Sequence, residues 1–107
     1  MKAWDIYSYT PPGFHGPHPV VIVSHPNRVA NKPMVSILAC SSQRAGRQAN
    51  PDEVILDMED GLSWPTLCFC DIIYAVRETD LTHHRGHVTA ERRTAIIRTI
   101  NRSNGWV

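Results

Sequence analysis

The side chains in this chain that are able to do chemistry gather in three short polar segments. His15 and His18 belong to the stretch GFHGPHP, Ser41 and Ser42 to CSSQR, and Asp71 closes CFCD. A histidine titrates near neutrality and can act as a general acid or base. Serine hydroxyls and arginine guanidinium groups donate hydrogen bonds to phosphate oxygens. These types suit metal-independent RNA cleavage, in which the 2′-hydroxyl attacks the adjacent phosphorus, although such a set also arises by chance in polar loops.

Metal binding is a weaker interpretation of the same sequence. Cys68 and Cys70 form a Cys-x-Cys pair, but no second pair stands at zinc-site spacing. The cluster His83, His84 and His87 lies in a polar stretch before a helix, where solvated histidines are common. We therefore expect no metal and no cofactor, and we expect the three cysteines to be reduced thiols packed in the core.

Other function classes lack their signatures. The serine pair is not framed by the glycines of a nucleophile elbow, and no glycine-rich phosphate loop is present. A formal net charge of +1 does not suit a dedicated duplex-DNA binder, although it allows a local basic site. The chain has neither a secretion signal nor an apolar run of about 18 residues, so we expect a cytoplasmic protein without a membrane segment.

The elements that must position these residues are mostly strands. Segment 10–19 holds four prolines and two glycines, so it is expected to be an exposed, stiff loop. Segments 25–33 and 41–52 are expected to be connecting loops. Alternating or continuous apolar runs predict strands over residues 4–9, 20–24, 34–40, 53–58 and 66–76, with a short last strand over 85–88.

The end of the chain predicts a helix. Thr89 is a good N-cap, Ile96, Ile97 and Ile100 form an apolar stripe, and Gly105 stands where a helix would stop. Five or six short strands and one C-terminal helix indicate a single domain over residues 1–107. The expected fold is mainly β, a small twisted antiparallel barrel with the helix covering part of the sheet.

Four segments in this order resemble the MazF/PemK toxin family of bacterial toxin–antitoxin systems, which shares its fold with the CcdB gyrase poisons. They read GPHPVVIVS, ILACSSQ, CFCDIIYAV and RGHVTAERRTAIIRTI. The resemblance implies an SH3-like barrel of the CcdB/PemK type and a homodimer. It further implies a metal-independent endoribonuclease that cleaves single-stranded RNA, and a cognate antitoxin whose disordered segment folds across the active groove.

The resemblance also implies roles for individual residues. Ser41 takes the place of the catalytic Thr or Ser, Asp71 that of an aspartate used by some members, and His18 the place where most members have arginine before proline. These three are the expected catalytic residues. The residues expected to bind substrate are His15, Ser42, Gln43, Arg44 and Arg47.

Two departures from the family pattern concern positive charge. His18 replaces the arginine before proline, and Phe69 stands where an arginine often precedes the Cys-Asp pair. Histidine is only partly charged at neutral pH, whereas arginine is a permanent bidentate phosphate ligand. Unless Arg28, Arg44 or Arg47 compensates, a weak nuclease, a nuclease with altered chemistry or an inactive protein would result.

Two rival functions use the same fold. CcdB-like toxins bind DNA gyrase through a C-terminal helix that ends near a Trp-Gly pair, and this chain ends SNGWV. An exposed Trp106 would suit such a protein interface, but we expect this tryptophan to fold back onto the domain. A binding module that has lost catalysis is the third possibility.

Overall fold

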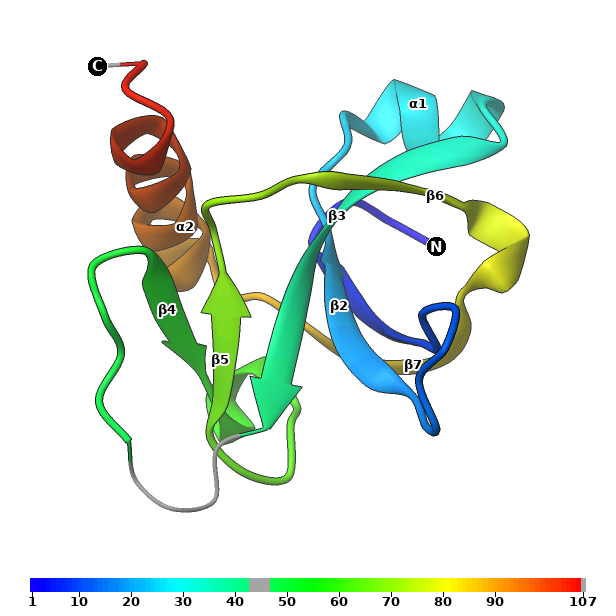
Figure 1. The fold of residues 1–107 in the computed structure, drawn as a ribbon. Coiled ribbons are helices and arrows are strands. Elements are labelled where there is room, and N and C mark those ends of the chain that lie inside the picture. The colour runs from blue at the N-terminus through cyan, green and yellow to red at the C-terminus, as the bar shows by residue number, and fades with distance from the viewer. Residues whose placement is uncertain (43–46, 107) are drawn as a thin grey trace.

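Strand β3 (Met34–Ser42) is the strand on which the sheet is assembled (Figure 1). One of its edges pairs with β2 (His18–Ile22). The other edge is shared, because its first half pairs with β6 (Tyr74–Arg77) and its second half with β5 (Thr66–Phe69). β3 therefore belongs to two diverging parts of the sheet, here called wings. Its first half lies in the wing that contains β6, and its second half in the wing that contains β5 and β4 (Glu53–Leu56).

The computed structural model describes residues 1–42 and 47–106. Its seven strands follow the order β4-β5-β3-β2-β1-β7, with β6 beside β3, and every pairing is antiparallel. The path ends at β4 and β7, so the sheet is not closed. The prediction of a mainly β fold with one C-terminal helix is confirmed, and the barrel is an open one. The remaining elements are β1 (Asp5–Tyr9), β4 (Glu53–Leu56), β7 (Thr82–His87), α1 (Pro26–Asn31), α2 (Ala90–Ser103) and the 3-10 turns η1 (Met58–Asp60) and η2 (Glu78–Asp80).

The sheet carries a hydrophobic core on each face. Neighbouring strand residues point to opposite faces, so Val21 and Leu38 join one core while Val20 and Ile37 join the other. The first core also contains Ile96 of α2, and the second contains Val29 of α1. In Figure 1, α2 stands beside β4 and β5, whereas α1 lies near the start of β3.

Apart from shifts of one or two residues at strand ends, three predicted elements differ from the structure. The expected single strand over 66–76 is divided into β5 and β6, because the two strands pair with different halves of the same edge of β3. The continuous apolar run in the sequence does not indicate this break. The expected loop over 25–33 contains α1, whose N-cap is His25 rather than a usual capping residue. The last strand begins at Thr82 and not at 85, since it pairs with β1 along its length.

Helix α2 begins where predicted, with the Thr89 hydroxyl accepting the amide of Arg92. The predicted apolar stripe is only partly correct. Ile96 is buried and Ile100 packs against the same core, but Ile97 is 48% exposed. Residues 96 and 100 are one helical turn apart, whereas residue 97 is rotated by about 100°. No helix in the described part of the chain is long and apolar enough to cross a membrane.

A buried carboxylate fastens α2 to the sheet. The Asp60 side chain is fully buried and accepts the amides of Thr89 and Asp57, each at 3.0 Å. Nη1 of Arg92 donates to Asp60 at 2.7 Å and to the carbonyl of Ile55 at 3.0 Å. Because a buried charge is tolerated only when paired, this arrangement sets the position of the helix on the β4 side.

Gly86 of β7 makes the close approach of η1 possible. A Cβ atom at this position would lie 2.0 Å from the carbonyl oxygen of Asp60, a backbone atom that cannot move independently. Gly61, directly after η1, has a φ of +90° and lies against the same strand. The close packing of η1 against β7 therefore explains why the RGHV segment has glycine at position 86.

A second buried carboxylate joins β1 to β7. Asp5 is 3% exposed and accepts hydrogen bonds from Nδ1 of His87 at 2.7 Å, Nε2 of His84 at 3.3 Å and the amide of Lys2 at 2.8 Å. Burial raises the pKa of Asp5, but the hydrogen bonds from His87, Lys2 and His84 outweigh it, so the net pKa lies below the ordinary value.

We predict that Gly86→Ala lowers the free energy of unfolding by about 3 kcal/mol, because the new methyl group overpacks a backbone contact. Urea denaturation of the purified protein measures this. Gly16→Ala is the matched control, since a Cβ there meets no atom within 4 Å, and it is expected to change stability by less than about 0.5 kcal/mol. Equal effects of the two substitutions would contradict the packing argument.

A second prediction concerns acid stability. A carboxyl group whose pKa is lower in the folded state stabilises the fold above its unfolded pKa, and this contribution is lost as the pH falls through the folded pKa. Asp5 should therefore help to destabilise the fold as the pH drops below about 4. Asp5→Asn should reduce stability at pH 7 and flatten the dependence below pH 4, as measured by urea denaturation from pH 3 to 7. The exposed Asp80→Asn serves as the control, and an unchanged acid slope in Asp5→Asn would refute the prediction.

Candidate functional site

His18 is the first residue of β2 and stands at the end of the proline-rich loop. The strand begins two residues earlier than predicted, so His18 belongs to an inner strand of the sheet rather than to the loop. The ring of Phe14 meets the imidazole edge-on, with centroids 5.3 Å apart and an interplanar angle of 89°. Pro19 follows and fixes the backbone φ. The imidazole is therefore held by the strand on one side and by the loop on the other.

Ser41 approaches His18 from the neighbouring strand. Val20 of β2 pairs with Ala39 of β3, and Val21 with Leu38. Extending this antiparallel register by two residues sets His18 opposite Ser41, where side chains on the same face stand roughly 5 Å apart at Cβ. Within the described residues, His18 and Ser41 are the two side chains that line both of the hollows described next.

The first hollow is apolar and measures about 570 Å³. Besides His18 and Ser41, its walls include the aromatic side chains of Tyr9, Phe14, Phe69 and Tyr74. Small side chains of β3 and β6 form its floor. It offers flat apolar surfaces directly beside the two polar residues.

The second hollow is polar and measures about 530 Å³. Ser8, Ser42, Trp64 and Arg85 line it together with the histidine and serine of the site. Hydroxyl groups, an imidazole and a guanidinium group around one space match the donors that a phosphate group requires. The arrangement can bind a phosphate and transfer a proton at its edge.

Arg85 is the cation that sequence reasoning missed. It lies on β7, far from His18 in the sequence, and reaches the hollow because β7 pairs with β1, which in turn pairs with β2. The sequence predicts only a short strand over residues 85–88 and assigns Arg85 no role. No local signal could have identified it, since its role depends on a long-range strand order.

Other predicted site residues lie elsewhere. Asp71 follows Leu67, the partner of Ser41, by four residues, roughly 13 Å of extended chain, and it lines neither hollow. His15 is exposed and also lines neither. Ser42 lines the polar hollow.

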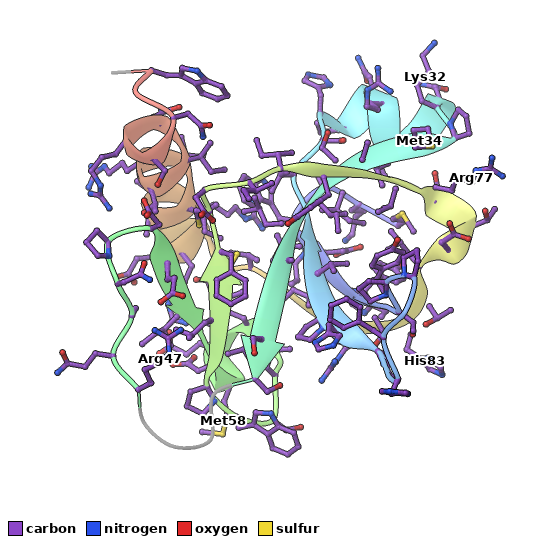
Figure 2. All side chains as sticks on the ribbon, in the orientation of Figure 1. Lys32, Met34, Arg47, Met58, Arg77 and His83 are labelled. Carbon is purple, nitrogen blue, oxygen red and sulfur yellow. The ribbon has the colours of Figure 1, made fainter. Side chains whose placement is uncertain are left out.

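Two of the three predicted compensating arginines, Arg47 and Arg28, do not line the hollows. Both terminal nitrogens of Arg47 bind Glu53, at 3.1 and 2.9 Å, and this hydrogen bonding lowers the pKa of Glu53. Figure 2 shows Arg47 beside β4. Arg28 lies on α1 and donates to the carbonyl of Met34. Gln43 and Arg44, also predicted to bind substrate, are outside the described residues.

The cysteines are buried free thiols, as expected. A hydrogen bond with the Cys40 thiol, together with burial, raises the pKa of Cys68 well above its ordinary value. The hydrogen bond with Cys68 and burial raise the pKa of Cys70 in the same way. Thiols of this kind are poor nucleophiles, so they contribute packing. Over residues 1–42 and 47–106, no three His, Cys, Asp or Glu side chains are arranged to hold a metal ion.

The C-terminal tryptophan contradicts our expectation. Trp106 is 64% exposed and does not fold back onto the domain. Its amide donates to the carbonyl of Asn101, so the backbone continues from the end of α2 and carries the indole outward. Ile97, in the middle of α2, is also an exposed large apolar side chain.

Comparison with solved structures shows which proteins share this fold. A toxin of Mycobacterium tuberculosis, MazF-mt6, is 19% identical, with a TM-score of 0.80 over 94% of this chain and 96% of that one. A mycobacterial endoribonuclease in complex with its cognate antitoxin is 20% identical, with a TM-score of 0.84 over 100% and 97%. The MazF of a MazE–MazF crystal structure from Deinococcus radiodurans is 14% identical, with a TM-score of 0.77 over 98% and 95%. At these identities the likeness establishes the fold.

Sequence comparison establishes the family. No curated protein matches the chain, but the family described as "PemK-like, MazF-like toxin of type II toxin-antitoxin system" matches residues 4–103. This match spans nearly the whole sheet and α2, and it agrees with the resemblance seen in the sequence. The chain therefore belongs to the PemK-like, MazF-like toxins of type II toxin–antitoxin systems.

Proposed function

We propose that this toxin is a metal-independent endoribonuclease that cleaves single-stranded RNA. The observation that carries the proposal is the convergence of His18, Ser41 and Arg85, from three different strands, on one polar hollow. A proton-transfer group, a hydroxyl donor and a permanent cation are the parts that phosphodiester cleavage by a neighbouring 2′-hydroxyl requires. Membership of the toxin family supports the same reaction.

In the proposed reaction, the scissile phosphate occupies the polar hollow. Ser41 and Ser42 donate hydrogen bonds to its oxygens, and Arg85 neutralises the charge that grows as the 2′-oxygen attacks phosphorus. The bond to the 5′-oxygen breaks, which leaves a 2′,3′-cyclic phosphate and a 5′-hydroxyl end. The 2′-hydroxyl loses a proton and the 5′-oxygen gains one. His18 carries out one of these two transfers, a role for which imidazole is suited at neutral pH, and solvent water exchanges the other proton.

The remaining predicted residues act on flanking parts of the RNA in this proposal. Asp71 orients the substrate or accepts a proton beyond the phosphate held by Ser41, because it stands further along the chain after β5. His15, Arg47, Gln43 and Arg44 contact neighbouring nucleotides. Bases stack on the aromatic walls of the apolar hollow, which requires an unpaired strand.

The proposed partners follow from the family and from the surface. A cognate antitoxin covers the hollows and blocks RNA, as the antitoxin complexes of the mycobacterial and Deinococcus relatives suggest. Ile72, Ile73 and Tyr74 are 40 to 51% exposed and supply an apolar surface for a homodimer. We place the toxin in the cytoplasm, where its RNA substrate is found.

The first test is cleavage of a long single-stranded RNA in the presence of EDTA. The wild type should give discrete cuts with 5′-hydroxyl ends. His18→Ala and Ser41→Ala should each lower the rate by about 100-fold or more, because each removes a proton-transfer group or a phosphate donor. Arg28→Gln, which alters an exposed cation on α1, should cut at the wild-type rate. No cleavage by folded wild-type protein would overturn the proposal.

A second test isolates the role of Arg85. Arg85→Gln should reduce the cleavage rate by about 100-fold, and Arg85→Lys should restore only part of it, because an ammonium group cannot make the bidentate contact. Arg98→Gln, at an exposed position of α2, is the matched control. Wild-type cleavage by Arg85→Gln would assign the phosphate contact to another cation.

The exposed Trp106 and Ile97 favour a second candidate function, a gyrase-binding toxin of the CcdB kind. An aromatic side chain exposed just beyond the end of α2 and an aliphatic side chain exposed in the middle of this helix suit a protein interface. Inhibition of DNA supercoiling by the wild type, abolished in Trp106→Ala, together with no RNA cleavage, would favour this function. If the wild type neither cleaves RNA nor inhibits supercoiling, the remaining candidate function is that of a binding module with the same fold.

A further inference from the structure

Another hollow, lined by both polar and apolar side chains, lies at the opposite end of β2 from the proposed active site. It measures about 680 Å³, and its polar lining is made by Lys2, Ser24, His25, His87 and Arg93. Ser24 follows His18 by six residues, about 20 Å along an extended strand. The two sites are therefore separate.

The lining presents hydrogen-bond donors and few acceptors. Nδ1 of His25 accepts the amide of Asn27 at 3.1 Å, so the neutral ring carries its proton on Nε2. The Ser24 hydroxyl, in a residue only 7% exposed, accepts the amide of Ser36 at 2.7 Å, which leaves its own proton to be donated. Nδ1 of His25 and the hydroxyl oxygen of Ser24 thus accept hydrogen bonds from the protein. Nε2–H of His25 and O–H of Ser24 remain able to donate to a ligand.

Arg93 is the permanent cation of this hollow. Its Nε donates to the carbonyl of Val88 at 2.8 Å, and Nη2 donates to Nε2 of His87. These bonds fix the guanidinium plane. Within the described residues, the N–H groups of Nη1 have no protein acceptor, so they are available to a ligand.

The nearest carboxylate does not compete for a ligand's place. No aspartate or glutamate of the described residues lines the hollow. Asp5 lies behind His87, and its oxygens are occupied by His87, His84 and the Lys2 amide. The side that faces the hollow is therefore formed by donors and cations.

We propose that this hollow is an anion site that takes a phosphate group, either free phosphate or a backbone phosphate of a nucleic acid. Oxyanions accept several hydrogen bonds at once, and a fixed guanidinium group with imidazole, hydroxyl and ammonium donors satisfies them. The apolar walls, which include Trp4 and Val29, leave room beside the phosphate for the rest of a nucleotide. The proposal does not depend on RNA cleavage.

Titration with inorganic phosphate at constant ionic strength and pH tests the site, followed by NMR of backbone amides and histidine rings. The expected result is saturable shifts at Ser24, His25 and Arg93 that fit one dissociation constant. Arg93→Gln should weaken this binding by about tenfold or more, since it removes a charge-assisted contact. Arg98→Gln, on the same helix and outside the hollow, should bind as the wild type does.

A second variant covers the case in which Arg93→Gln fails to fold. Lys2→Gln combined with His25→Asn removes an ammonium group and a ring donor, while asparagine keeps the acceptor that caps α1. Its affinity should also fall by about tenfold. Uniform shifts that do not saturate, or unchanged binding in this folded double variant, would overturn the proposal.

The source of the phosphate is decided by a second probe, a deoxythymidine tetranucleotide, which lacks the 2′-hydroxyl and cannot be cleaved. Tighter saturation of the same residues by this probe identifies a nucleic-acid backbone site. Saturation by inorganic phosphate alone identifies a free-anion site. If neither probe saturates these residues, the proposal is refuted. Shifts confined to the hollow of His18, Ser41 and Arg85 would support the proposed function and reject the second site.

Discussion

The branching of β3 is the constraint on which the remaining structure depends. The strand pairs with β2 along one edge and divides its other edge between β6 and β5. This division leaves Ser41 beyond the branch and beside the start of β2, where His18 begins its strand. It also opens the apolar hollow between the wings. The candidate site is therefore a product of strand order, and no single segment contains it.

The polar hollow is lined by an arginine, although the chain lacks arginine at two positions where the resemblance to the family leads us to expect it. Arginine is absent before the proline of β2 and before the Cys-Asp pair, and the cation at the polar hollow comes from β7 instead. Because a guanidinium group acts through position and not through sequence context, a strand two places away in the sheet can supply it. The hollow therefore has a cation even without arginine at these two positions.

Local patterns predicted much of this fold and only part of its site. Period-2 runs identified most strands, and Thr89 identified the start of α2, because both signals lie within a few residues. The break between β5 and β6 was missed because the two halves of β3 that pair with these strands are distant from them in sequence. Distance in sequence is also the reason that Arg85 was missed. The start of α1 was missed for a different reason: its cap is local, but histidine is not a usual N-cap residue. The resemblance to the family indicated His18 and Ser41 as site residues. That they lie close together could be seen only from the β2–β3 register.

The contact between Gly86 and Asp60 has a consequence for substrate recognition. Gly86 is the next residue after Arg85, and its backbone is pressed against η1, which is itself tied to α2 by a buried carboxylate. The segment that bears the guanidinium group thus loses its backbone freedom when the protein folds. In the proposed function, a phosphate would meet a cation whose backbone is already ordered, so less conformational entropy would be lost on binding than with a cation on a flexible loop.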